Sequence, residues 1–294
     1  MFRLIRAFAP VFMLVAAPAV GASKARTILF VGNSFTQGSM SSVLRYRAQT
    51  VTDLNGYGYG GVPALFQTFA VERRLNYAVF LETQGGKALS FHWSERRPLL
   101  DRRWDAVVLQ EYSTLDPVTP GDPTNYGKYA QLLADMFTQA NPKVDVELMA
   151  TWSRADLTYL PGSPWSGKPI TAMALDIRKA ADGIKALSGT IGGVAPVGEA
   201  WNRAIQSGIA DANPYNGISP GQIDLWAPDG YHASAAGYYL EALVVFGRVT
   251  HVDPRKLGAR EQAASDLGIA PSVAVALQRV AHKELITRHH PKAP

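Results

Sequence analysis

The sequence contains no cysteine among its 294 residues. Without a thiol, the chain forms no disulfide bond, offers no thiolate as a nucleophile or metal ligand, and has no cysteine that could carry a lipid. Charged residues are also scarce, at 18% of the chain, and the formal net charge is only +5. A charge this small and this evenly spread argues against a nucleic-acid-binding protein.

The N-terminus has the pattern of a secretory signal peptide. Arg3 and Arg6 precede a mostly apolar stretch over residues 7–20, and small residues follow at the positions that a signal peptidase reads. Because the apolar stretch is short for a membrane span, we predict cleavage after Ala22, with an uncleaved anchor as the alternative. Residues 1–22 would then be the signal peptide. We expect a periplasmic or secreted protein without stable membrane insertion.

The remaining chain has the composition of a folded protein. Apolar residues make up 47% of the sequence, and no segment is polar or repetitive enough to predict disorder. We predict a single domain over residues 23–294. Helical spacing returns after the last apolar run, with predicted helices over residues 259–267 and 271–286. These belong to a predicted C-terminal helical extension over about residues 253–290.

Short apolar runs along the chain alternate with stretches that have helical spacing. The runs predicted as buried strands are residues 27–31, 77–81, 104–109, 144–150 and 193–197. The main predicted helices are residues 126–140, 170–187 and 199–208. Strands that alternate with helices pair in parallel through right-handed crossovers, which leaves helices on both faces of the sheet. The sequence therefore predicts an α/β fold, a three-layer α/β/α sandwich around about five parallel strands.

Ser34 is the most informative residue at the ends of these strands, where parallel sheets of this kind bind their ligands. It follows an apolar strand run directly after Gly32 and Asn33. A serine on a sharp turn at a strand end is held clear of its neighbours, as a nucleophile must be. The alternative is a capping box, because Ser34 and Gln37 fit the pattern Ser-x-x-Gln and the hydroxyl would then only start a helix.

A serine nucleophile also needs a base and a group that orients the base. Among the six histidines, only His232 has an acid at a suggestive spacing, in Asp229-Gly230-Tyr231-His232. The glycine indicates a turn, and Ser234 is a predicted N-cap of the helix that follows. The carboxylate could bond one imidazole nitrogen and leave the other facing a serine. Alternatively, Asp229 only caps the turn and His232 is a half-buried surface residue.

Gly32-Asn33-Ser34 near one end and Asp229-x-x-His232 near the other resemble the first and last signature blocks of the SGNH hydrolases. This group is also called the GDSL esterase/lipase superfamily, and the resemblance covers about residues 27–250. More narrowly, the chain resembles the branch that opens with Gly-Asn-Ser-Phe. The resemblance implies a flavodoxin-like sheet and a triad of Ser34, His232 and Asp229 that hydrolyses esters through an acyl-enzyme. That mechanism needs neither a metal nor a cofactor.

The resemblance also implies an oxyanion hole made of three donors. Family members use the N–H of the nucleophile, a glycine N–H after the second strand and an asparagine side chain after the third. Ser34 and Gly86 match the first two, with Gly85 as the alternative glycine. The asparagine has no match, but Gln110 carries the same amide on a stem one methylene longer. Gln110 could instead be a buried amide that ties the strand end to a neighbouring loop.

Aromatic and charged side chains follow two of the predicted strands and are candidates for substrate binding. They are His92, Trp152, Arg154 and Asp156. Aromatic faces next to charged hydrogen-bonding groups suit a sugar ring, whereas a lipase would present a more continuous apolar groove. The alternative is that the aromatic side chains only pack in the core or at the rim of the site.

These observations predict a secreted serine esterase that removes small acyl groups, such as acetyl, from carbohydrate or glycan. Its substrate would be a small-molecule or polysaccharide ester. Two alternatives remain open at this stage. An O-acyltransferase would use the same triad, and a glycan-binding protein would keep the scaffold after its catalytic machinery had decayed.

Overall fold

The computed structural model describes residues 24–287 of the chain. The predicted signal peptide lies outside the described residues, as do the last three residues of the predicted C-terminal extension. The strands are β1 (Arg26–Gly32), β2 (Thr52–Asp53), β3 (Tyr77–Thr83), β4 (Ala106–Leu109), β5 (Asp145–Ala150) and β6 (Gly193–Pro196). They form one six-stranded sheet in the order β2-β3-β1-β4-β5-β6, and every pair is parallel. The predicted α/β fold with a parallel sheet is confirmed.

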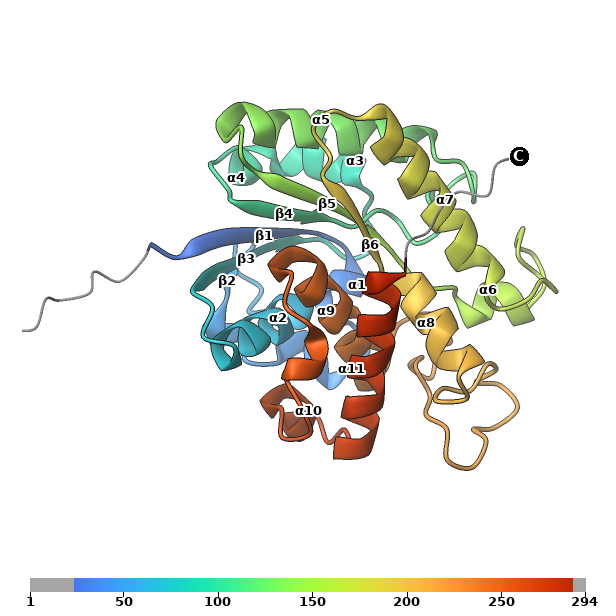
Figure 1. Cartoon of the computed structure of the whole chain (residues 1–294). Coiled ribbons are helices and arrows are strands. Elements are labelled where there is room, and N and C mark those ends of the chain that lie inside the picture. The colour runs from blue at the N-terminus through green and yellow to red at the C-terminus, as the bar shows by residue number, and fades with distance from the viewer. Residues whose placement is uncertain (1–23, 288–294) are drawn as a thin grey trace, which may run out of the picture.

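Helices cover both faces of this sheet (Figure 1). The longer helices are α2 (Gly61–Glu72), α5 (Thr124–Ala140), α7 (Ala172–Leu187), α8 (Val197–Gln206), α9 (Ala235–Thr250) and α11 (Pro271–Ile286). In Figure 1, α5 and α7 lie above the sheet, and α2, α9 and α11 lie below it. The three layers that the alternation of strands and helices predicts are therefore present.

Strand β1 shows why this arrangement forms. Ile28 and Phe30 enter the apolar core that includes α2, α9 and α11, whereas Leu29 and Val31 enter the core that includes α5 and α7. All four side chains are fully buried. Alternate residues of a strand point to opposite faces, so a strand covered on both faces must be apolar throughout. The continuous apolar run before Gly32 is the result.

The sixth strand, β2, was not predicted. It contains only Thr52 and Asp53, which pair with Phe80 and Leu81 at the edge of the sheet. Two residues are too few to show an alternating pattern, so only the pairing with β3 identifies this strand. The shorter helices also escaped prediction as separate elements. They are α1 (Ser34–Gln37), α3 (Leu89–Phe91), α4 (Arg97–Leu100) and α6 (Ala155–Tyr159), with a π-helical turn at His92–Arg96. The short helix α10 (Gln262–Asp266) lies within the helix predicted over residues 259–267.

The C-terminal helices join the same core as the sheet. Helix α11 has the bounds predicted for it, with Pro271 as its first residue, and its Leu277 and Val280 are buried with residues of α9. Ser234 caps α9 as expected, because its hydroxyl accepts a hydrogen bond from the Gly237 N–H at 3.2 Å. Among residues 24–287, no helix combines the length and apolar character that a membrane crossing requires.

Candidate active site

Ser34 lies on the sharp turn between β1 and α1. Asn33 is the N-cap of α1, and its side-chain oxygen accepts a hydrogen bond from the Phe35 N–H at 3.2 Å. The capping interpretation of Ser34 is therefore wrong, because Asn33 takes that role and Ser34 is the first helical residue. Gly32 is required at this turn, since a β-carbon there would lie 2.5 Å from the Thr36 hydroxyl. The cap of α1 therefore does not use the Ser34 hydroxyl.

Gln110 holds this turn against the end of β4. Its Oε1 accepts hydrogen bonds from the Asn33 N–H at 2.8 Å and from the Thr36 hydroxyl at 3.1 Å. Its Nε2 donates to the carbonyl of Glu111, and the side chain is fully buried. These contacts are those of a buried amide that ties two segments together. The oxyanion role of Gln110 stays a prediction, and the contacts present give it a positioning role.

Asp229 and His232 form a hydrogen-bonded pair within one turn of the chain. The distance from His232 Nδ1 to Asp229 Oδ2 is 2.6 Å. The other carboxylate oxygen accepts hydrogen bonds from the backbone N–H groups of Tyr231 and His232, at 3.0 and 2.9 Å. Burial alone would raise the pKa of Asp229, but these hydrogen bonds outweigh it and hold the pKa below its usual value. Asp229 is thus an ionised group that directs Nε2 of His232 away from itself.

His232 lies beside the turn that carries Ser34. Its ring centroid is 5.9 Å from that of Phe35, the residue after Ser34. Helix α9 is tied to the same turn, because the Tyr238 hydroxyl donates to the Ser39 carbonyl at 2.9 Å and lies 3.4 Å from the Ser34 carbonyl. Two segments about 200 residues apart in the sequence therefore meet at the carboxyl end of β1. Their catalytic roles stay predictions.

The glycine loop after β3 is fixed next to the same turn. Gly86 has a φ of +70° in the turn from Gln84 to Lys87, and a β-carbon there would meet nothing within 4 Å. The Asn33 amide donates to the Lys87 carbonyl at 3.0 Å. Both Gly85 and Gly86 are exposed beside the site. The N–H of Gly86 remains our predicted oxyanion donor, with that of Gly85 as the alternative.

The buried carboxyl group of Glu111 also contacts the chain that follows this glycine loop. Glu111 Oε1 accepts hydrogen bonds from the Leu89 N–H at 3.1 Å and from the Tyr112 N–H at 2.6 Å. Burial raises the pKa of Glu111 to about 8. The group is therefore largely uncharged at neutral pH, so it ties the loops after β3 and β4 together without placing a full negative charge beside the site.

Trp152 does not face the site, and the prediction that it contacts substrate is wrong. It is fully buried. Its ring stacks between Phe35, at a centroid distance of 4.0 Å, and Trp201, at 4.7 Å. Its Nε1 donates to the Tyr231 carbonyl at 3.2 Å. An aromatic residue after a strand is thus used here to brace the Ser34 turn against the His232 turn.

His92 is also buried, so the prediction that it contacts substrate is wrong as well. The π-helical turn at His92–Arg96 directs its ring inward, where Nδ1 contacts the carboxylate of Glu82. Glu82 is itself fully buried near the end of β3 and accepts a hydrogen bond from the Asn55 amide at 3.0 Å. Through Glu82, the end of β3 thus contacts both the π-helical turn and the loop that carries Asn55.

Arg154 and Asp156, the other two predicted binding residues, do lie beside the histidine turn. Arg154 Nε donates to Asp156 Oδ1 at 3.0 Å, and its NH1 group donates to the Ser113 hydroxyl at 3.3 Å. The guanidinium carbon stands 3.6 Å from the ring centroid of Tyr231. Contact with substrate stays a prediction for both residues. Tyr231 was missed, although its place between Asp229 and His232 was a signal.

Two exposed tyrosines, Tyr159 and Tyr215, form a surface beside this turn. Their rings meet edge to face at 6.3 Å between centroids. They are 37% and 45% exposed, which is unusual for large aromatic side chains. Tyr215 packs on Gly230, because a β-carbon there would lie 2.1 Å from its hydroxyl oxygen. Sequence analysis missed Tyr215, since its loop shows only turn-forming residues.

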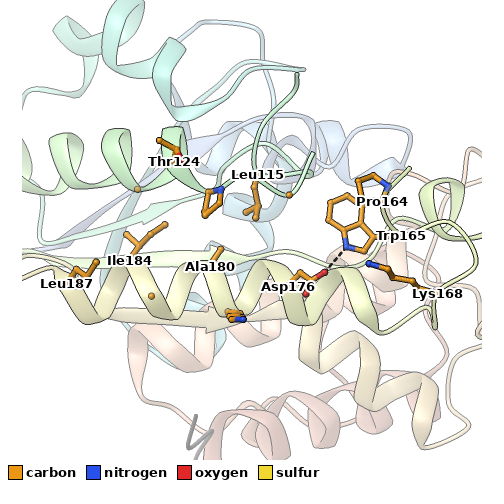
Figure 2. Close-up of a pocket in the computed structure, with 14 residues that line it drawn as sticks. Leu115, Thr124, Pro164, Trp165, Lys168, Asp176, Ala180, Ile184 and Leu187 are labelled. Atoms are coloured by element: carbon orange, nitrogen blue, oxygen red, sulfur yellow. Dashed lines mark hydrogen bonds between the residues drawn. The ribbon is translucent and has the colours of Figure 1, made fainter. Parts of the chain in front are cut away.

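A separate groove of about 590 Å³ lies between α5 and α7 (Figure 2). Apolar side chains such as Leu115 and Ile184 line it, and the indole nitrogen of Trp165 donates to Asp176 at 2.9 Å. None of the predicted site residues lines this groove. Within residues 24–287, no three histidine, aspartate or glutamate side chains are grouped so that they could hold a metal ion.

No protein-family model matches the sequence, and no curated protein is significantly similar to it. Solved structures do match the fold. A DUF4886 family protein from Bacteroides uniformis is 19% identical, with a TM-score of 0.58, over 90% of this chain and 95% of that one. A protein described as a GDSL-like lipase from Parabacteroides merdae is 17% identical, with a TM-score of 0.53, over 78% of this chain and 96% of that one.

A third structure, described as an SGNH hydrolase from Slackia heliotrinireducens, is 24% identical with a TM-score of 0.49, over 77% of this chain and all of that one. The likeness to the GDSL-like lipase is a likeness of fold. The six-stranded parallel sheet flanked by helices is the fold of the SGNH/GDSL hydrolases.

Proposed function

We propose that this protein is a serine esterase in which Ser34 is the nucleophile. The observation that carries the proposal is the 2.6 Å hydrogen bond between His232 and Asp229, in a turn that packs on Phe35 directly after Ser34. A base oriented in this way is what a serine needs for activation. The pair also supports an active enzyme over a binding protein with decayed machinery.

In the proposed reaction, each of these residues has one role. Ser34 Oγ attacks the ester carbonyl carbon while its proton passes to Nε2 of His232. Asp229 stabilises the charged imidazole, and the N–H groups of Ser34 and Gly86 stabilise the negative oxygen. The intermediate then expels the alcohol, which takes the proton from His232. Water attacks the acyl-enzyme by the same route and releases the acid and the free serine.

For the substrate, we propose a small acyl group such as acetyl on a carbohydrate. Tyr215 packs on Gly230, the residue after Asp229, and together with Tyr159 it offers exposed aromatic faces of the kind on which sugar rings stack. Arg154 and Asp156 provide charged hydrogen-bonding groups on the same side of the turn. The apolar groove between α5 and α7 lies elsewhere and is lined by none of the predicted site residues.

Acetate release tests this function directly. Purified protein incubated with an O-acetylated oligosaccharide should release acetate, and prior treatment with a fluorophosphonate should stop the release because it blocks the serine. Transfer of the acetyl group to added sugar in place of water would identify the acyltransferase alternative. If neither acetate nor transferred acetyl forms from acetylated sugars or simple acetyl esters, the proposal is wrong.

The tyrosine surface makes a second, separate prediction. Replacing Tyr215 with alanine should raise KM for an acetylated oligosaccharide about tenfold relative to KM for 4-nitrophenyl acetate, equivalent to about 1.4 kcal/mol of lost binding. The matched control is Tyr215→Phe, which keeps the stacking face and should restore most of the preference. An equal change in KM for both substrates would show that Tyr215 does not recognise the sugar.

A further inference from the structure

Gln110, the predicted third oxyanion donor, uses its side-chain amide in contacts within the protein. Gln110 stands where the resemblance predicts the third donor, but its Oε1 holds the Asn33 N–H and its Nε2 donates to the Glu111 carbonyl. Turning this amide toward a substrate would leave the buried Asn33 N–H without its partner, which costs about 1–3 kcal/mol. A hydroxyl group near Ser34 could supply a donor without this cost.

Tyr231 places its hydroxyl group close to the Ser34 side chain. Its side chain interacts with the side chains of Ser34 and Ser113. Two contacts of the ring and its burial agree with this position. The ring centroids of Phe35 and His232 lie 5.4 and 4.2 Å away, and Tyr231 is half-buried between the nucleophile and the base.

The surrounding groups hold the Tyr231 ring in place. The Arg154 guanidinium stacks on it at 3.6 Å and is itself anchored by Asp156 and by the Ser113 hydroxyl. The Tyr231 carbonyl accepts the hydrogen bond from the buried Trp152 indole. A donor that is already fixed needs little reorganisation when charge develops, which is why preorganised donors are effective in catalysis.

The Tyr231 hydroxyl also keeps its proton at neutral pH. Burial raises its pKa above the usual value, and the nearby Arg154 charge only partly opposes this. A neutral phenol can donate a hydrogen bond to an oxyanion without giving up its proton. The group can therefore act as a hydrogen-bond donor at neutral pH.

We propose that the Tyr231 hydroxyl is the third oxyanion donor, in the place that an asparagine side chain would otherwise take. The inference rests on the proposed esterase function. In the resting protein the hydroxyl lies against the Ser34 side chain, and it turns to the carbonyl oxygen as Ser34 Oγ attacks. The carbonyl π bond opens onto that oxygen, the serine proton goes to His232, and Tyr231 keeps its own proton. The hydrogen bond is released when the carbonyl re-forms and the alcohol leaves.

The test is Tyr231→Phe, which removes the hydroxyl and keeps the ring on which Arg154 stacks. We expect kcat for 4-nitrophenyl acetate to fall about 100-fold, as on loss of one oxyanion donor, with KM little changed. Inhibition by a boronic acid, whose tetrahedral adduct resembles the intermediate, should weaken by a similar factor. A residue that only supports the fold would lower the melting temperature without this parallel loss.

The control is Tyr77→Phe, because the Tyr77 hydroxyl accepts a hydrogen bond from Arg26 at the opposite end of the sheet. It should match the wild type in both kcat and boronate affinity. Turnover that is lost in Ser34→Ala but unchanged in Tyr231→Phe would overturn this inference and leave the proposed function standing. If the wild type shows no Ser34-dependent turnover, both fail.

Discussion

Replacing Ser34 with alanine should lower kcat for a short-chain aryl ester by about 10⁴- to 10⁶-fold, because it removes the oxygen on which the proposed acyl-enzyme forms. The fold should be unaffected. Alanine is well tolerated in the first turn of a helix, and the cap of α1 comes from Asn33. Steady-state kinetics and the melting temperature measured on the same preparation check both parts of this expectation.

Ser39 provides a matched control for this variant. It lies five residues from Ser34, and its hydroxyl contacts Gln37 at 3.4 Å. Ser39→Ala should keep wild-type turnover, and a fluorophosphonate should label it as fully as the wild type. Ser34→Ala should not be labelled at all. Residual turnover above one tenth of the wild-type rate in Ser34→Ala would rule out Ser34 as the nucleophile.

Asp229→Asn should lower kcat by about 10⁴-fold with little change in stability. The asparagine oxygen can still accept the two backbone hydrogen bonds from Tyr231 and His232 that shape the turn. Its amide nitrogen would then face Nδ1 of His232. Because the amide donates a hydrogen bond, Nδ1 would have to be the acceptor. The ring would be held in the tautomer that carries its proton on Nε2, where it cannot take the proton of Ser34.

Pre-steady-state kinetics should show the loss in the acylation step, since that step needs the base. The control is Asp224→Asn, because Asp224 also makes a turn through its side chain, accepting from the Trp226 N–H at 2.8 Å, but does not contact His232. Asp224→Asn should leave kcat within about twofold of the wild type. A loss of less than tenfold in Asp229→Asn would mean that the carboxylate only shapes the turn.

Much of the fold could be predicted because the helices and strands are defined by local patterns. The bounds of α11 follow from Pro271 and from apolar residues at helical spacing, and β1 and β3 follow from their continuous apolar runs. Strand β2 could not be found in this way, because its two residues are a strand only through their pairing with β3. Short helices such as α6 depend in the same way on contacts made after folding.

The same distinction applies to the candidate site: contacts within one turn could be predicted from the sequence, and contacts between distant segments could not. Asp229 and His232 could be paired from the sequence because they lie three residues apart in one turn. Burial could not be predicted for Trp152 or His92, since an aromatic ring after a strand can face either the solvent or the core. The stacking of Trp152 on Phe35 and Trp201 depends on three separate segments. Tyr231 was missed because its partners, Ser34 and Arg154, come from two other strand ends.

The two edges of the sheet limit how this protein can associate with other chains. An exposed edge strand offers unpaired backbone groups on which a foreign strand can add. Here one edge strand, β2, is only Thr52–Asp53, and the other, β6, ends at Pro196, which has no N–H to donate. At β6 the Arg248 guanidinium, paired with Glu147 at 2.9 Å, also lies against Gly193. The central strands that carry the site are thus flanked by edges that resist strand addition and aggregation.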